Sequence, residues 1–269
     1  MSSSRGKTVP LTLPRRWVSD ILHFGKDVPI ITGDRGLRVK KLVAARRSVQ
    51  HPPSWQAIIL KAFGLASERV PELRRSYLSY PWPRLHEMPY SVGTVVIDRE
   101  YEGERAVFCA PLLHPEKLPL ADIQRKCDAW KVDPVAAHGP LRRQVRTAKL
   151  PRPIRRAMWW YGLKCSGYLK GRYFGTFAVN CLAGMRGRIT QMCFPVTSYI
   201  YYGVPEKDGT MPIQYGFDHR VYDGSTCARA VGIVEEILSG PILEEVLRGT
   251  PLAVSKPMSN CFRGFRAKR

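Results

Sequence analysis

The chain has 269 residues, of which 44% are hydrophobic and 24% charged, and its formal net charge is +21. This length and balance are typical of a globular protein with a substantial core. No stretch approaches eighteen uninterrupted apolar residues and the first ten residues are polar, so we expect neither a membrane-spanning helix nor a secretory signal. The charge predicts attraction to phosphate-bearing or acidic partners, with a merely solvated basic surface as the alternative.

The hydrophobic pattern predicts helices and strands in alternation. Residues 1–13 are expected to be disordered, and Pro14 opens a helix that runs to Phe24. The next predicted elements, in chain order, are an extended run over 28–32, a helix over 37–47, a strong helix from residue 53, strands over 90–97 and 105–113, a helix over 120–130, strands over 196–202 and 211–217, and helices over 224–237 and 242–248. Asp208-Gly209 predicts a hairpin turn between the last two strands. We therefore expect one mixed α/β domain over residues 14–250, followed by a basic tail over 251–269.

Seven cysteines are scattered along the chain without a C-x-x-C pair, and their number is odd. This pattern predicts neither a zinc site nor a disulfide framework. Free thiols are typical of a reducing compartment, so we expect a cytoplasmic protein without a bound metal.

Residues 134–205 contain no Asp or Glu. Basic and aromatic side chains lie together at the centre of this stretch, and we refer to four of them as the Arg–Trp group: Arg155, Arg156, Trp159 and Trp160. Basic residues beside interfacial aromatics suit a helix on an anionic surface, whereas a core helix with a basic outer face is the alternative. We interpret residues 134–172 as a basic aromatic insertion. The Arg–Trp group is hypothesised to bind a lipid or long-chain acyl substrate, or an anionic membrane at which the protein is peripheral.

The most informative stretch is 216–225, which reads GFDHRVYDGS. A β-rich run ends at His219, and four residues later Asp223-Gly224 opens a helix in which Asp223 takes a natural N-cap position. A histidine at a helix start is often structural, and the H-x-x-x-D-G spacing is a weak signal alone. A neutral imidazole held there is also suited to general-base catalysis, which typically contributes about 10²–10⁴-fold to a rate.

The stretch 218–224 resembles the D-H-R-x-x-D-G signature of the acyltransferase cores of 2-oxoacid dehydrogenase complexes, and the H-x-x-x-D-G of chloramphenicol acetyltransferases. Residues 175–182, GTFAVNCL, are similar to that family's G-T-F-T-I-S-N-L strand. Residues 58–73 resemble its long helix and 90–113 its following strand pair. The resemblance covers most of residues 14–250, with a gap around 134–172. It implies a chloramphenicol acetyltransferase-like α/β fold, a two-layer sandwich of a mixed sheet with helices.

The resemblance implies an acyltransferase that moves an acyl group between a thioester carrier and an acceptor, with His219 as the general base. A thiol has a pKa of about 8.5 and an imidazole about 6.5, so neutral histidine can take the thiol proton as sulfur attacks a carbonyl. Coenzyme A, as the acyl carrier, or an acidic acyl-carrier protein is the expected partner. Both are anionic, which agrees with the charge of the chain.

In the resembled family a Ser or Thr hydroxyl of the GTFTIS strand donates to the oxyanion. Here Asn180 stands at the Ser position, and an amide can also donate, with Thr176 as the fallback. The family's aspartate, here Asp223, holds the histidine loop by pairing with arginine. The candidates for that partner are Arg15 and Arg16, and structural support is further expected from Arg220 and Gly224.

The resembled enzymes are trimers with the active site between subunits, so the resemblance implies a homotrimer in which His219 faces the Asn180 side of a neighbour. We expect a free-standing catalytic domain without lipoyl domains. Two alternatives remain open: an inactive acyltransferase-fold protein that binds an anionic surface, membrane or nucleic acid, and a non-catalytic assembly subunit. The intact His-Asp-Gly phrase favours the enzyme, because a binding protein has no need of it, and nucleic acid is not expected as a partner.

Overall fold

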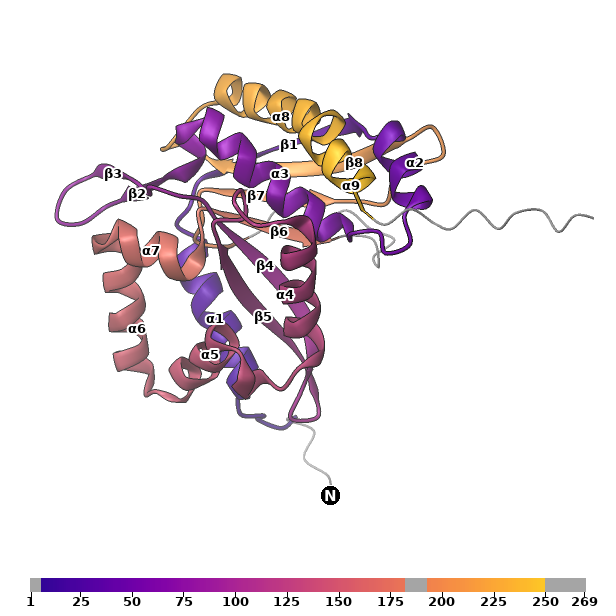
Figure 1. The fold of residues 1–269 in the computed structure, drawn as a ribbon. Helices are drawn as coiled ribbons and strands as arrows, with labels where there is room; N and C mark the ends of the chain where they lie inside the picture. The colour runs from indigo at the N-terminus through magenta and orange to yellow at the C-terminus, as the bar shows by residue number, and fades with distance from the viewer. Residues whose placement is uncertain (1–5, 182–192, 250–269) are drawn as a thin grey trace, which may run out of the picture.

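A six-stranded mixed sheet lies at the centre of the structure, a computed structural model that describes residues 6–181 and 193–249 (Figure 1). The strand order is β1-β8-β7-β6-β4-β5, and β6 runs parallel to both of its neighbours while the other pairs are antiparallel. A separate two-stranded hairpin is formed by β2 and β3. The strands are β1 (Ile30–Arg38), β2 (Arg75–Leu78), β3 (Arg84–Glu87), β4 (Val92–Tyr101), β5 (Glu104–Leu113), β6 (Phe177–Cys181), β7 (Ser198–Tyr202) and β8 (Thr210–Asp218).

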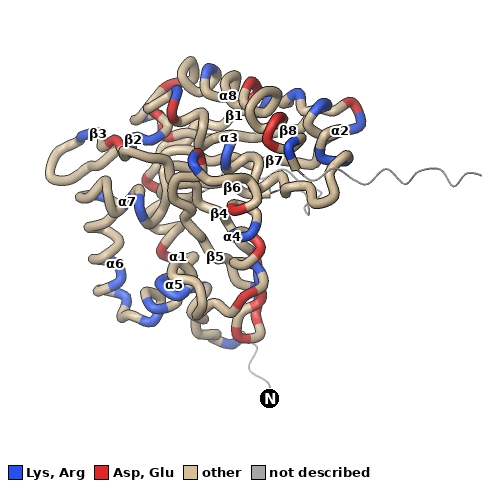
Figure 2. The backbone as a smooth tube through the Cα atoms, in the orientation of Figure 1, with Lys and Arg blue, Asp and Glu red and all other residues tan. Residues whose placement is uncertain are grey.

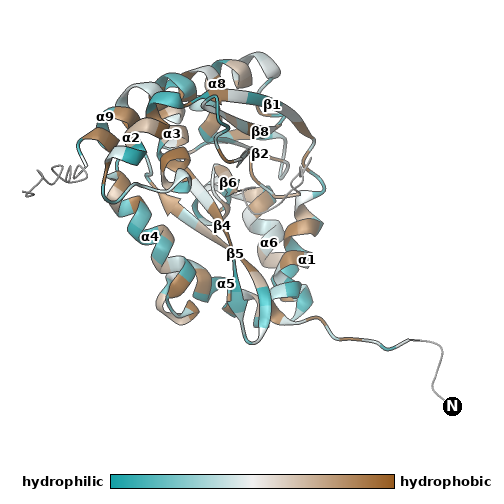
Figure 3. Cartoon of the chain, turned by 90° about the vertical axis from the view of Figure 1, so that its right-hand side faces the viewer, coloured by the Kyte–Doolittle hydropathy of each residue, from teal (hydrophilic) through white to brown (hydrophobic). Residues whose placement is uncertain are grey.

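Helices pack on both sides of this sheet. They are α1 (Leu13–Gly25), α2 (Lys40–Ser48), α3 (Trp55–Arg69), α4 (Leu120–Val132), α5 (Gly139–Lys149), α6 (Arg152–Trp160), α7 (Gly167–Phe174), α8 (Gly224–Ser239) and α9 (Pro241–Leu247), with the short helices η1 (Pro71–Arg74), η2 (Val135–Ala137) and the π-type η3 (Tyr161–Cys165). Figure 3 shows α4 on one side of β4 and β5, and α1 with α6 on the other.

The two faces of the sheet build two hydrophobic cores because successive side chains of a strand point to opposite faces. Phe177 and Val179 belong to the larger core, which packs against α3, α8 and α4. Ala178, between them, belongs to the smaller core with Trp159 of α6 and Phe24 of α1. The expected α/β class with a mixed sheet and helices is confirmed, although helices cover both faces of the sheet and a two-layer sandwich was expected.

Most predicted elements are present with shifted ends. The helix from Pro14, the helix after Pro53, the strand pair before residue 113 and the β7–β8 hairpin all form. The helix predicted over 37–47 begins only at Lys40, because Leu37 and Arg38 pair with Met211 and Thr210 as the end of β1.

The sequence interpretation missed the β2–β3 hairpin, and in the insertion it considered only one helix, the one around the Arg–Trp group. Residues 134–172 fold into η2, α5, α6, η3 and part of α7, which lie beside α1 (Figure 1). The predicted basic tail over 251–269 lies outside the described residues, as do residues 1–5 of the predicted disordered N-terminus and Leu182 of the GTFAVNCL strand.

Candidate active site

His219 follows the last residue of β8 and its side chain is exposed to solvent. Its backbone N–H donates to the carbonyl of Pro29 at 3.2 Å, and its ring Nδ1 lies 3.2 Å from the carbonyl oxygen of Tyr222. A carbonyl oxygen can only accept, so this contact places the ring proton on Nδ1 in the neutral imidazole. The lone pair is then on Nε2, which is the arrangement that a general base needs.

A buried ion pair braces the residues on either side of His219. The Asp218 carboxylate is 1% exposed and receives the Arg220 guanidinium on both oxygens, at 2.9 and 2.7 Å. The guanidinium also stacks 4.3 Å above the ring of Tyr77 on β2. Such a two-pronged arginine–carboxylate contact fixes orientation as well as adding energy. Arg220 therefore makes structural contacts to the residue before His219 and to the β2–β3 hairpin.

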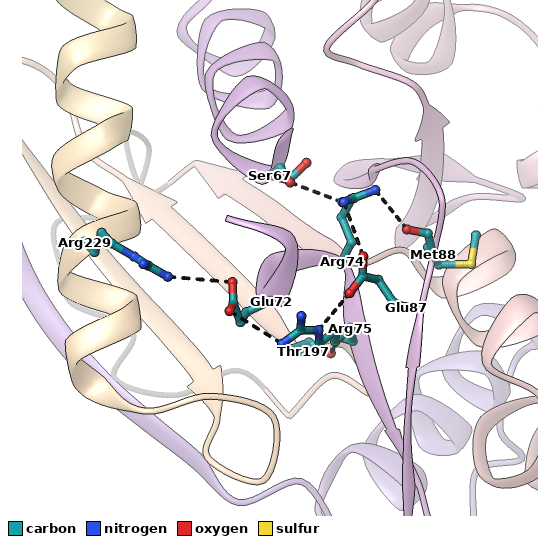
Figure 4. A network of polar contacts seen from close by, with 8 residues as sticks. All are labelled: Ser67, Glu72, Arg74, Arg75, Glu87, Met88, Thr197 and Arg229. Atoms are coloured by element: carbon teal, nitrogen blue, oxygen red, sulfur yellow. Dashed lines mark hydrogen bonds and ion pairs between the residues drawn. The ribbon is translucent and has the colours of Figure 1, made fainter. Parts of the chain in front are cut away.

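The hairpin that carries Tyr77 is fixed in turn by a polar network (Figure 4). Thr197, whose backbone carbonyl accepts from the N–H of Asp218 at 2.8 Å, donates its hydroxyl to the carbonyl of Arg75 at 2.6 Å. Arg75 binds Glu87 of β3 at 2.8 Å, and Glu72 of η1 at 3.5 Å. The network therefore connects the β2–β3 hairpin to the start of β7, directly beside the histidine loop.

Asp223 is the N-cap of α8 rather than the partner of an arginine. Its carboxylate accepts from the N–H of Thr226 at 3.1 Å and from the hydroxyl of Ser225 at 2.8 Å. The hydrogen bond from Ser225, together with those from Thr226, lowers the pKa of the Asp223 carboxyl. A cap of this kind stabilises the start of a helix, because it satisfies a backbone N–H that has no partner within the helix.

The expected pairing of Asp223 with Arg15 or Arg16 is wrong within the described chain. Arg16 donates instead to the carbonyl of Leu11 on the approach to α1. Gly224 also lacks a steric reason to be glycine, since a Cβ atom there would meet nothing within 4 Å. The aspartate holds the histidine loop through the helix start and not through an arginine.

Asn180 lies on β6, where it is paired in register with Tyr201 of β7. Its side-chain oxygen accepts from the N–H of Cys181 at 2.8 Å, and its side chain also hydrogen-bonds to Tyr201. Burial raises the pKa of Tyr201 to about 12, against the smaller effect of the Asn180 hydrogen bond. Tyr201 thus stays protonated at neutral pH. The sequence interpretation missed this tyrosine, because only the strand register brings it beside Asn180.

His219 and Asn180 lie at opposite ends of the strands. Phe177, Ser198 and Phe217 are level with one another across β6, β7 and β8. Asn180 is three residues from that level in one direction, whereas His219 is two residues from it in the other. At 3.3 Å per residue the two positions are about 16 Å apart along the strands. One chain alone therefore does not bring the histidine and the asparagine together.

Thr176 is not an oxyanion donor in this structure. The residue is fully buried, and its hydroxyl donates to the carbonyl of Val92 at 3.2 Å while accepting from the N–H of the same residue at 3.1 Å. The hydroxyl joins β6 to β4 instead. This corrects the expectation of a fallback donor.

The Arg–Trp group does not form a joint surface element. Arg155 is 5% exposed and pairs with the buried Asp20 of α1, which Arg156 also contacts at 2.7 Å. Trp159 is buried, with its ring 4.7 Å from that of Trp17 in an edge-on contact. Only Trp160 is exposed, where it lies against Tyr80. Arg155 and Arg156 neutralise the buried carboxylate of Asp20. The expectation that they bind a substrate or an anionic surface is therefore wrong.

Residues 6–181 and 193–249 contain no group of three or more His, Cys, Asp and Glu side chains placed to hold a metal ion. Within the same ranges, no helix combines the length and the apolar character needed to cross a membrane.

The chain has the fold of the catalytic cores of dihydrolipoamide acetyltransferases. It is similar to the solved Azotobacter vinelandii dihydrolipoamide acetyltransferase with a TM-score of 0.62 and 18% identity, over 90% of this chain and 95% of that one. A probable dihydrolipoamide acetyltransferase from Listeria monocytogenes gives 0.61 and 15%, over 88% and 96%. The cubic core of a pyruvate dehydrogenase multienzyme complex gives 0.59 and 16%, over 90% and 95%. No family model and no curated protein matches the sequence.

Proposed function

We propose that the chain is an acyltransferase that moves an acyl group between a thioester carrier and an acceptor, with His219 as the general base. The observation that carries the proposal is the exposed imidazole whose Nδ1 is occupied by the Tyr222 carbonyl. The similar Azotobacter vinelandii enzyme was studied for the roles of a serine, a histidine and an asparagine in its mechanism, the asparagine four positions after the histidine. Asp223 takes that position here, as the cap that holds the loop.

The reaction follows from the chemistry of the imidazole. Nε2 of His219 removes the proton of the acceptor as the acceptor attacks the thioester carbonyl, and a tetrahedral oxyanion forms. When the intermediate collapses, the carbon–sulfur bond breaks and the imidazolium returns the proton to the leaving thiolate. General-base help of this kind is worth about 10²–10⁴-fold, and one well-placed oxyanion donor about 10²–10³-fold.

The active unit contains at least two copies of the chain. His219 and Asn180 are too far apart in one chain to act on the same carbonyl, whereas a cyclic oligomer can set the histidine of one copy opposite the asparagine of the next. A similar solved structure is a cubic core, and cubic symmetry contains threefold axes. A homotrimer with a shared site satisfies both observations.

The thioester carrier is coenzyme A or an acidic acyl-carrier protein. Both carry several negative charges, and the net charge of +21 favours their approach. Release of the acyl group from either carrier requires the same proton transfers at His219.

Co-expression of His219→Ala and Asn180→Ala chains tests both the base and the shared site. Each variant alone is expected to lose at least 10²-fold in acetyl-coenzyme A-dependent acyl transfer to a thiol acceptor. When the two chains assemble at random into trimers, about one quarter of all interfaces join an intact histidine to an intact asparagine, so co-expression is expected to restore up to about one quarter of the activity.

His51→Ala is the matched control, because His51 is an exposed histidine in the loop before α3. It should transfer acyl groups at the wild-type rate. Full activity of His219→Ala would reject the general base. Inactive mixtures of folded chains, as judged by circular dichroism and sedimentation, would reject the shared site.

A further inference from the structure

A cavity of about 360 Å³ lies under the inserted helices, on the side of the sheet that carries Ala178. Its walls come from α1, β5, α5, α6, η3 and α7, and they are mainly apolar and aromatic, including Trp17, Trp159, Tyr173 and Phe174. Volumes of 300–1,000 Å³ are typical of pockets for small ligands. The volume and lining suit an apolar ligand group.

Gly162 indicates that the space is open inside the protein. This glycine of η3 is buried and lines the cavity, yet a Cβ atom placed on it would meet only Leu169, at 3.9 Å. The space in the side-chain direction of this buried glycine is therefore largely unfilled. The pocket opens to solvent beside the exposed side chains of Met158 and Tyr161, so a ligand can reach this unfilled apolar space.

The rim of the cavity is cationic. Arg143 of α5 lines it with an exposed guanidinium stacked 4.3 Å above the ring of Tyr173, and forms no ion pair within the described ranges. Figure 2 shows further Lys and Arg on α5 and α6. The absence of Asp and Glu between residues 134 and 205 leaves this surface without compensating charge from its own segment.

Two polar side chains of the wall have structural roles. The Gln144 amide accepts from the N–H of Cys109 and donates to the carbonyl of Val107, both at 3.0 Å. Burial raises the pKa of the Cys109 thiol to about 12, so the nucleophilic thiolate is absent at neutral pH. Neither Gln144 nor Cys109 therefore offers a nucleophile to a bound ligand.

We propose that this cavity binds the unbranched acyl chain of an anionic amphiphile of the fatty-acid class, with the negative head group at Arg143. The site is separate from the proposed acyl-transfer chemistry and does not depend on it. β5 is four strands away from β8 in the sheet, or about 19 Å from the strand that carries His219. Two sources supply such a chain, a free fatty acid and an acyl thioester.

The test is a calorimetric titration of the intact protein with dodecanoate, with dodecyltrimethylammonium and with dodecanoyl-coenzyme A. Dodecanoate is expected to bind at one site per chain and at least fivefold more tightly than the cation of equal chain length. Tighter binding of dodecanoate than of the coenzyme A ester supports the free acid as the source, and the reverse order supports the thioester. Equal binding of anion and cation, or no binding of either anion, overturns the proposal.

Three variants locate the site. Gly162→Leu fills the cavity and should weaken dodecanoate at least tenfold, whereas Gly232→Leu, in helix α8 with equally free space at Cβ, should leave it unchanged. Arg143→Gln should weaken dodecanoate about two- to fivefold, the range of an exposed ion pair, without weakening the cation. A Gly162→Leu protein that keeps the wild-type melting temperature and binds dodecanoate as tightly as wild type rejects the cavity as the site.

Discussion

The guanidinium of Arg220 donates to both carboxylate oxygens of Asp218, so the residues immediately before and after His219 form an ion pair with each other. Arg220→Lys keeps the charge but removes the two-pronged geometry and the stacking on Tyr77. We expect the free energy of unfolding to fall by about 1–3 kcal/mol, because a hydrogen bond to a charged group is lost at a buried carboxylate. Urea denaturation measures this loss, and acyl transfer should fall with it.

Arg248→Lys is the control for that substitution, since its pair with Glu244 is exposed on both sides. The expected change there is within about 0.5 kcal/mol. Equal effects of the two substitutions would mean that the Arg220 contact does not stabilise the histidine loop.

Asp20 is expected to be one of the most sensitive positions outside the proposed site. Its fully buried carboxylate neutralises Arg155 and contacts Arg156, so Asp20→Asn leaves buried positive charge without compensation. Loss of one partner from a buried ion pair costs about 3–5 kcal/mol. Thermal and urea unfolding should report this loss, while Asp27→Asn, at an exposed pair with Lys164, should cost under about 1 kcal/mol. A small effect of Asp20→Asn would contradict the buried pairing.

Because Lys170 is buried, we expect the free energy of unfolding to rise at alkaline pH. Burial lowers the pKa of this lysine to about 8, with Asp218 opposing and Arg220 and Lys164 assisting, whereas the ordinary value is 10.5. Between these values the unfolded chain binds more protons than the folded chain, so the unfolding free energy increases with pH. Below about pH 8 both states are protonated and the contribution is constant.

Lys170→Met should abolish that rise, as measured by urea unfolding at a series of pH values from 7 to 10.5. Lys126→Met, on an exposed position of α4, should retain it. An unchanged pH dependence in Lys170→Met would show that the rise belongs to other groups.

Two substitutions at Asn180 distinguish a hydrogen-bond donor to the oxyanion from a residue with a structural role. Asn180→Ser restores the residue of the resembled family and should keep acyl transfer within about tenfold of wild type. Asn180→Val removes every donor and should lower kcat by about 10²-fold with little change in KM, because the oxyanion exists only along the reaction path. Loss of activity in the serine variant with full activity in the valine variant would reject the assignment.

The sequence predicted the central fold because its signals are local. The hydrophobic period of α3, the Asp208-Gly209 hairpin and the Asp223 cap each depend on neighbours within a few residues. Leu37 is an example of what local signals leave undetermined, because a single apolar residue fits the hydrophobic period of either a helix or a strand. Its pairing with Met211 of β8 places it in β1.

The candidate site was only partly predictable for the same reason. His219 and Asn180 were found from motifs, whereas the position of Tyr201 depends on strand register. Arg155 was assigned to a surface because its partner Asp20 lies 135 residues earlier in the chain, beyond the reach of any local pattern. The resemblance also supplied no guide to residues 134–172, the part of the chain it did not cover.

Gln144 affects whether the β5 edge of the sheet can pair with a strand of another molecule. β5 is the last strand of the sheet, and a last strand with free N–H and carbonyl groups is a template onto which the strand of another molecule can add. The Gln144 amide occupies two such groups, those of Cys109 and Val107, from the side of α5. The inserted helices therefore protect this part of the β5 edge from the addition of a strand of another molecule.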